Sequence, residues 1–239
     1  MDVLRWDPHP AGRQIMAAKI DVWLLRLDLE DPAGALLATL SPEERRHAAR
    51  RRLALDGRRY AIGRASLRAI LARYLGGPAA GLHFRNEPRG RPVLDPPTEL
   101  SFSVAHAGAV GLVAVARART VGVDVEPLSA AGQIADIADR YLPQDRVAAI
   151  RTGPADLRDE QWVGLWTEVE ACVKLDGRGL AELDPPSAAA LLRRDMHVVR
   201  FGPTPDHIGT LAYGGQTALV SYLAFAPIAF EPPAAGRIS

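Results

Sequence analysis

The sequence predicts an α+β fold made of two similar halves, with a ligand-binding cleft between them. One observation is the order of the elements: each half has a buried strand, then a helix that begins near a proline, then a longer helix that ends at glycine. Another is a constant offset of 101 residues between identical residues: Val22 and Val123, Pro42 and Pro143, Arg45 and Arg146, Gly63 and Gly164, and Gly76 and Gly177. Five identities can also arise by chance, so duplication and coincidence both remain open. If the duplication is real, a cleft between two packed halves is the expected place for a ligand.

The first half begins with a predicted strand over residues 19–27, which its apolar side chains make largely buried. Ser41 is a good N-cap for the helix that follows, Pro42 suits its first position and Glu44 completes a capping box. A second helix is expected to end at the Gly-Gly-Pro that follows Leu75. Three short strands then follow, the first two joined as a hairpin, over residues 100–105, 111–117 and 121–126.

The second half continues with a helical region over residues 134–150, interrupted at Pro143, and a long helix over residues 156–175. A short helix and two terminal strands are predicted over residues 189–194, 196–201 and 218–225. We therefore divide the chain into an N-terminal half (residues 1–118), a C-terminal half (residues 119–226) and a frayed tail (residues 227–239).

The composition excludes several classes of protein. A net charge of +1 gives no basic excess for a nucleic-acid partner, and the single cysteine excludes an intrachain disulfide. No apolar stretch is long enough to cross a bilayer, and the first residues lack the pattern of a signal peptide, so we expect no membrane association and a cytoplasmic location. Seven arginines between Arg45 and Arg59 are interpreted as a solvated helix face.

The segment Val121–Pro127 is the first candidate for chemistry. Alternate side chains of a strand share a face, so Asp124 and Glu126 point one way, about 7 Å apart, while the valines face the core. Two carboxylates on a rigid face suit Mg²⁺, although any half-exposed strand shows the same alternation. Gly122 adds to the metal hypothesis, because a glycine in a strand often allows a ligand or another backbone to come close.

The second candidate lies in the long predicted helix. At about 100° per residue, Glu170 and Lys174 lie on neighbouring flanks beside the apolar stripe, whereas Glu168 lies on its other side. The pair Glu170 and Lys174 is either an ordinary i, i+4 surface pair or part of the wall of a cleft.

Three basic residues are further candidates. His106 ends a predicted strand, where it is either structural or a donor to a phosphate or carboxylate. Arg59 and Arg91 are either surface arginines or phosphate ligands. The sequence contains no glycine-rich phosphate loop, no serine nucleophile elbow and no zinc-binding spacing.

The order of these motifs is more specific than any one of them. The chain contains Gly-Arg-Pro at 90–92, Phe-Ser-Val-Ala-His at 102–106, Gly-Val-Asp-Val-Glu at 122–126 and Trp-Thr-Glu-Val-Glu-Ala-Cys-Val-Lys at 166–174. In this order the motifs resemble those of the Sfp-type 4′-phosphopantetheinyl transferases, from the helix of Arg59 to about Phe225. The resemblance implies the fold of that family, with two pseudo-symmetric α/β halves and the active site in the cleft between them.

The resemblance also implies a reaction and a set of catalytic residues. The 4′-phosphopantetheine arm of coenzyme A would pass to a serine of an apo acyl, peptidyl or polyketide carrier protein, with release of 3′,5′-ADP. Asp124, Glu126 and Glu170 would hold Mg²⁺, with Mn²⁺ as an alternative. Glu170 would act as the general base, and Lys174 and His106 would contact the phosphates during transfer.

The substrate coenzyme A would be bound by Arg59, Arg91, Pro92, His106 and Lys174, with the two arginines near its 3′-phosphate and adenine. Because a duplicated chain can complete its site alone, we expect a monomer. The resemblance also implies a role in secondary metabolite biosynthesis.

Two positions depart from the family pattern. Ala105 stands where serine is common and Val169 where lysine is common, and either change would be expected to weaken coenzyme A binding. A non-catalytic coenzyme A-binding homologue would bind without modifying a carrier, and a metal-dependent phosphohydrolase would release 3′,5′-ADP with no carrier present. Both alternatives stay open at this stage.

Overall fold

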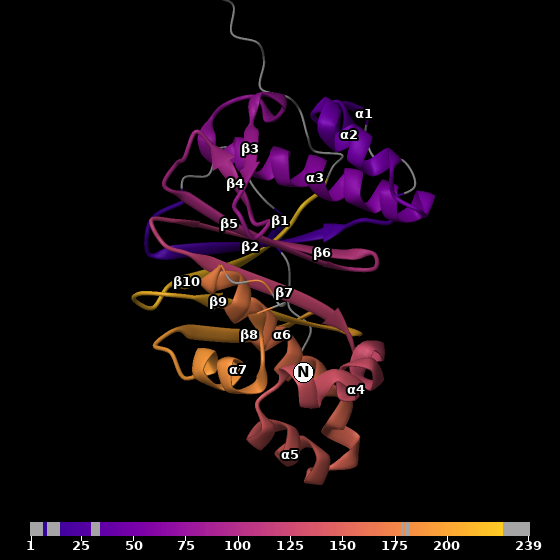
Figure 1. Cartoon of the computed structure of the whole chain (residues 1–239). Helices are drawn as coiled ribbons and strands as arrows, with labels where there is room; N and C mark the ends of the chain where they lie inside the picture. The colour runs from indigo at the N-terminus through magenta and orange to yellow at the C-terminus, as the bar shows by residue number, and fades with distance from the viewer. Residues whose placement is uncertain (1–6, 9–14, 30–33, 178, 180–181, 227–239) are drawn as a thin grey trace, which may run out of the picture.

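A computed structural model describes residues 7–8, 15–29, 34–177, 179 and 182–226. These residues form four layers, in which helices cover the outer faces of two sheets that pack together in the middle (Figure 1). The tail predicted over residues 227–239 lies outside the described residues. Within the described part of the chain, no helix is long and apolar enough to cross a membrane.

The N-terminal elements follow the predicted pattern closely. They are β1 (Asp7–Pro8), β2 (Lys19–Arg26), α1 (Gly34–Leu37), α2 (Pro42–Ala49), α3 (Ala54–Leu75), β3 (His83–Asn86), β4 (Pro92–Asp95), β5 (Leu100–Ala107) and β6 (Val110–Arg117). The predicted capping box is present, because the Glu44 N–H donates to the Ser41 hydroxyl at 3.2 Å and the Ser41 N–H donates to the Glu44 carboxylate at 2.9 Å. The sequence patterns did not predict β1, α1, β3 or β4.

The C-terminal elements include one helix that the prediction misplaced and one strand that it missed. They are β7 (Val121–Pro127), α4 (Ala131–Tyr141), α5 (Gln144–Thr152), α6 (Arg158–Asp176), α7 (Pro185–Leu192), β8 (His197–Thr204), β9 (His207–Tyr213) and β10 (Leu219–Ala224). The short helix predicted over 189–194 begins earlier, because the Asp184 carboxylate accepts a hydrogen bond from the Ser187 N–H and Pro185 fits the first turn. Strand β9 was not predicted, although it is the central strand of its sheet.

The two sheets repeat one arrangement. Strands β2, β6 and β5 lie side by side in the order β2-β6-β5, and strands β7, β9 and β8 in the order β7-β9-β8, with every neighbouring pair antiparallel. A long helix covers each set, and both helices end at a left-handed glycine, Gly76 (φ 74°) after α3 and Gly177 (φ 77°) after α6. This match confirms the two similar halves. Strand β10 returns to pair with β2, so the C-terminal segment completes the first sheet.

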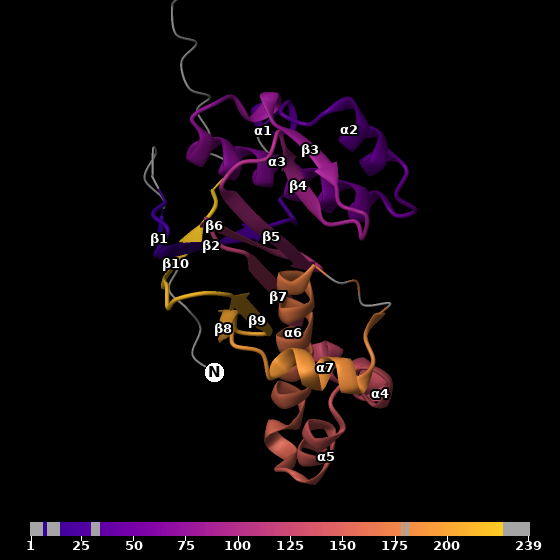
Figure 2. The ribbon, with the colours of Figure 1, turned by 60° about the vertical axis from the view of Figure 1, so that its left-hand side comes forward.

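Apolar side chains between the layers bring the candidate residues together. One cluster lies under α3, a second under α6, and a third between the two sheets, where Val22 meets Val123 and Phe201. The sheets are also joined by a hydrogen bond of 3.1 Å from the Val123 N–H to the Ser103 hydroxyl of β5. In Figure 2, α6 runs beside β7 with one end at the edge of the first sheet. The ends of β5, β7 and α6 therefore meet where the two halves join.

Candidate active site

Gly122 allows helix α6 to lie unusually close to strand β7. A Cβ atom at this position would lie 2.0 Å from the Ala171 carbonyl oxygen and 2.6 Å from the Leu175 backbone nitrogen. Contacts this short are sterically impossible, so only glycine permits the observed packing. The expectation of a close approach at Gly122 is confirmed, and the approaching group is the backbone of α6. As a result, the side chains of Glu170 and Lys174 reach the carboxylates of β7.

Three carboxylates and one ammonium group meet at this junction. Asp124 is almost fully buried, and its Oδ1 accepts a hydrogen bond of 2.6 Å from Nζ of Lys174. The same Nζ lies 3.8 Å from Oε2 of Glu170, one helical turn before it. Glu126 is half-buried two residues beyond Asp124 on the strand. The other oxygen of Asp124, Oδ2, is buried and accepts no hydrogen bond among the described residues.

The electrostatics of this cluster favour a further cation. Burial raises the pKa of Glu170 to about 8, and the charge of Asp124 adds to this effect. Burial and the Asp124 charge also raise the pKa of Glu126 to about 7. Burial raises the pKa of Asp124 as well, while Lys174 opposes the change. At these pKa values the carboxyl groups of Glu126 and Glu170 hold protons near neutral pH, and a cation bound in the cluster would replace those protons.

A basic pocket lies beside the cluster. It has a volume of about 270 Å³ and is lined by Arg51, Arg59, Tyr60 and His106, together with Asp56. The Nε of Arg59 is buried without a hydrogen-bond partner among the described residues, and the Arg51 guanidinium lies 5.4 Å from the Tyr60 ring centroid. Partial desolvation, followed by the charges of Lys174 and Arg51, lowers the pKa of His106. The pocket therefore offers cationic and N–H donors to an anionic group.

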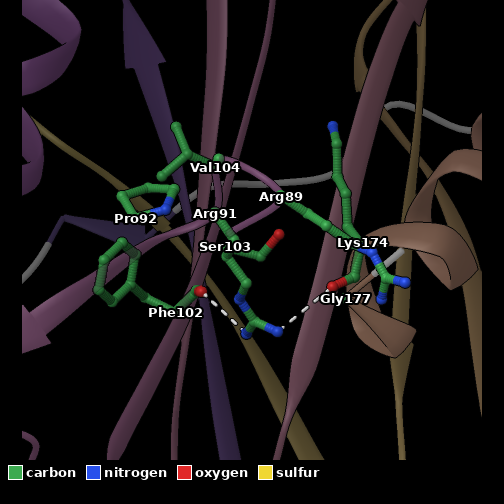
Figure 3. A pocket seen from close by; sticks show the side chains of 9 residues that line it. Arg89, Arg91, Pro92, Phe102, Ser103, Val104, Lys174 and Gly177 are labelled. Carbon is green, nitrogen blue, oxygen red and sulfur yellow. Dashed lines mark hydrogen bonds between the residues drawn. The ribbon is translucent and has the colours of Figure 1, made fainter. Parts of the chain in front are cut away.

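A second pocket, of about 220 Å³, lies between the two halves (Figure 3). Arg91, Pro92 and Phe102 line it from the N-terminal half, and Lys174 and Gly177 from the C-terminal half. The Arg91 guanidinium joins the halves, since it donates to the Lys174 carbonyl at 3.4 Å and to the Phe102 carbonyl at 3.5 Å. The predicted cleft between the halves is thus present, and residues of both halves form its wall.

The two departures from the family pattern lie in the core. The Ala105 side chain is 4% exposed and packs between the two sheets. Val169 belongs to α6 and is 0% exposed on the buried face of that helix. Because both side chains pack against apolar neighbours, neither replacement removes a polar group from the pockets described above. The structure gives no basis for the expected weakening of coenzyme A binding.

The structure brings most of the predicted site residues together, with some differences. Asp124, Glu126, Glu170 and Lys174 form one cluster, and Glu168 lies outside it, paired with Arg200 and Arg146, as the helical spacing predicted. His106 and Arg59 share the basic pocket, whereas Arg91 and Pro92 line the other one.

The sequence analysis predicted only Arg59 and His106 of the residues that line the basic pocket. Arg51 and Tyr60 line it beside Arg59 and His106. The only signal for Arg51 was the run of arginines, which had been interpreted as a solvated face. In the part of the chain that the structure describes, no three His, Cys, Asp or Glu side chains are already arranged to hold a metal ion.

The site combines clustered carboxylates and a lysine with a neighbouring arginine pocket. These are the groups expected of an enzyme that acts on a phosphorylated substrate. The family described as 4′-phosphopantetheinyl transferase, N-terminal, matches residues 31–118, and the 4′-phosphopantetheinyl transferase superfamily matches residues 120–225.

Three curated proteins give the same result over most of the chain. The 4′-phosphopantetheinyl transferase HetI of Nostoc sp. is 31% identical over 183 residues, which are 75% of this chain and 77% of that protein. The 4′-phosphopantetheinyl transferase psf-1 of Bacillus pumilus is 30% identical over 70% of each chain. The 4′-phosphopantetheinyl transferase Sfp of Bacillus subtilis is 22% identical over 61% of this chain and 63% of its own. The chain therefore belongs to the 4′-phosphopantetheinyl transferase superfamily, and its motifs are consistent with the Sfp type.

Proposed function

We propose that this transferase moves the 4′-phosphopantetheine arm of coenzyme A to a serine of an apo carrier protein at the junction of its two halves, in a Mg²⁺-dependent reaction. The observation that carries the proposal is the cluster of Asp124, Glu126 and Glu170 beside Lys174, next to a pocket lined by Arg59 and His106. In the reaction, the serine oxygen forms a bond to the pantetheine-side phosphorus, the phosphorus–oxygen bond to 3′,5′-ADP breaks, and the serine proton is taken up by a base.

The residues present fit a divalent metal. Asp124, Glu126 and Glu170 supply oxygen donors, which Mg²⁺ and Mn²⁺ prefer, and the buried Oδ2 of Asp124 lacks a partner among the described residues. Bound there, the ion would polarise phosphate oxygens and neutralise negative charge on the leaving group.

Glu170 has the properties of the general base. Its side chain is 14% exposed, at the edge of the cluster, where it lies between the proposed metal site and a serine hydroxyl that enters from the solvent. It accepts the serine proton directly or through one water molecule. Lys174 and His106 donate hydrogen bonds to the phosphate oxygens, where negative charge develops.

Coenzyme A is held by the two pockets in this proposal. Arg59, with Arg51 beside it, binds an anionic phosphate of the cofactor, because a buried guanidinium nitrogen without a partner favours an anion. Arg91 and Pro92 support the adenine end of the molecule along the pocket of Figure 3.

The setting of the reaction is also part of the proposal. The partners are coenzyme A and an acyl, peptidyl or polyketide carrier protein, and no nucleic acid or membrane takes part. The enzyme acts as a cytoplasmic monomer, since both halves of one chain supply the site, and serves secondary metabolite biosynthesis.

The residue roles are tested by comparing Glu170→Gln with Glu168→Gln. Both variants lose one carboxylate from α6, but Glu168 is paired with Arg200 outside the cluster. Transfer to an apo carrier, followed by intact-protein mass spectrometry, should fall at least 100-fold in Glu170→Gln and change less than 3-fold in Glu168→Gln. Full turnover by Glu170→Gln would refute its assignment as the base.

A further inference from the structure

Among the described residues, Lys174 is the only cationic group in the carboxylate cluster. Its Nζ lies 2.6 Å from Oδ1 of Asp124 and 3.8 Å from Oε2 of Glu170, so it stands between two groups proposed to hold the metal. Its side chain is 31% exposed, against 5% for that of Asp124. The ammonium therefore reaches the buried carboxylate from the more exposed side of the cluster.

The choice of lysine at this position is unusual for this chain. Of its 29 basic residues, only Lys19 and Lys174 are lysines. An arginine would present a planar fork that binds a carboxylate through two hydrogen bonds, whereas lysine presents a compact charge on a flexible stem. A flexible ammonium can leave a carboxylate more readily than a guanidinium that is bound twice.

The Lys174 side chain also borders a second site, the pocket between the two halves. Besides contacting Asp124, it lines the pocket between the halves with Arg91 and Pro92. In Figure 3 its ammonium extends away from the Arg91 guanidinium, and rotation about its side-chain bonds can bring it to a diphosphate bound between this pocket and the carboxylates.

We propose that Lys174 is an internal counter-ion that occupies the cation position at Asp124 in the ligand-free enzyme, and that the diphosphate of coenzyme A draws it away. This proposal rests on the metal site of the proposed function. Metal and coenzyme A then bind cooperatively, because the cofactor gives Lys174 an alternative partner and frees Asp124. By thermodynamic reciprocity, the metal tightens coenzyme A binding by the same factor.

The proposal is tested with Mn²⁺ as the probe, and free Mn²⁺ is measured by electron paramagnetic resonance at pH 8, where protons compete less for the carboxylates. Without coenzyme A, Lys174→Met should bind Mn²⁺ at least 10-fold more tightly than the unchanged enzyme, because its metal need not displace an ammonium. Addition of coenzyme A should tighten Mn²⁺ binding at least 10-fold more in the unchanged enzyme than in Lys174→Met.

Two control variants distinguish the effect of a positive charge at position 174 from the effect of the net charge of the protein. Lys19→Met removes the other lysine, which lies 4.0 Å from the buried Asp21, and makes the same change in net charge. It should leave Mn²⁺ affinity within 2-fold of the unchanged enzyme. Lys174→Arg keeps the charge and should not tighten Mn²⁺ binding. If Lys174→Met is not folded by circular dichroism, Lys174→Gln takes its place.

Equal Mn²⁺ affinity in Lys174→Met and the unchanged enzyme, with binding intact, would overturn the counter-ion proposal and leave the metal site standing. An equal gain of affinity in Lys19→Met would also overturn it, since the effect would then come from net charge alone. If no form binds Mn²⁺, even with coenzyme A, both this inference and the proposed metal site fail.

Discussion

Gly122 is the position at which one added methyl group should separate the two sides of the site. In Gly122→Ala the new Cβ would lie 2.0 Å from the Ala171 carbonyl oxygen, whereas ordinary contacts begin at 3.4 Å, so α6 must move by about 1.4 Å. Overpacking of this kind costs about 1–3 kcal/mol of the free energy of unfolding. Because α6 carries Glu170 and Lys174 while β7 carries Asp124, the shift also widens the cluster.

The effect on activity should exceed the effect on stability. A misplacement of about 1 Å in a catalytic group can lower the rate about 100-fold. We therefore expect kcat/KM for carrier modification to fall at least 30-fold in Gly122→Ala, at a temperature where the variant is still folded. Stability is measured by urea denaturation, and transfer by intact-protein mass spectrometry.

The matched control is Gly132→Ala in helix α4, where an added Cβ meets no atom within 4 Å. Alanine is the better helix former, so this variant should be unchanged in activity and as stable or more stable. If Gly122→Ala retained kcat/KM within 3-fold of the unchanged enzyme, the reasoning that the glycine sets the spacing of the site would be refuted.

Three further outcomes are expected. Arg59→Ala should raise the KM for coenzyme A at least 10-fold with a smaller change in kcat, and an unchanged KM in steady-state assays would exclude Arg59 from cofactor binding. With the metal chelated, the melting temperature should fall as pH rises from 5 to 8, because the folded chain keeps the protons of Glu126 and Glu170 up to pKa values of about 7 and 8, whereas the unfolded chain releases them near 4.5. At about 1.4 kcal/mol per pKa unit, Glu170 contributes at most about 5 kcal/mol of this loss, and Glu170→Gln should flatten the slope. Val169→Lys, which introduces the family's common residue, should destabilise the chain by about 3 kcal/mol or more in urea denaturation, because Val169 is 0% exposed in the core; a neutral result would contradict this packing.

Local patterns predicted the parts of the site that depend on local geometry. The alternation of β7 put Asp124 and Glu126 on one face, and helical spacing separated Glu168 from the pair Glu170 and Lys174. The start of α2 and the ends of α3 and α6 were predicted because capping residues and glycines determine them over a few residues.

Tertiary packing determined what the sequence patterns missed. The arginine run gave no sign that Arg51, in the connection between α2 and α3, lines the same pocket as His106. This arrangement depends on how the first half packs. The pairing of Lys174 with Asp124, which are 50 residues apart in the sequence, requires the close approach at Gly122.

The central claim is that this enzyme loads carrier proteins at a metal-dependent carboxylate site. The most direct test incubates it with coenzyme A and several apo carrier proteins, with Mg²⁺ or with a chelator, and measures the intact mass of each carrier. We predict the gain of one phosphopantetheine on a carrier serine with Mg²⁺, loss of the gain with chelator and its return when Mg²⁺ is added again. A gain that persists in the chelator, or coenzyme A binding without modification of any carrier, would contradict the account.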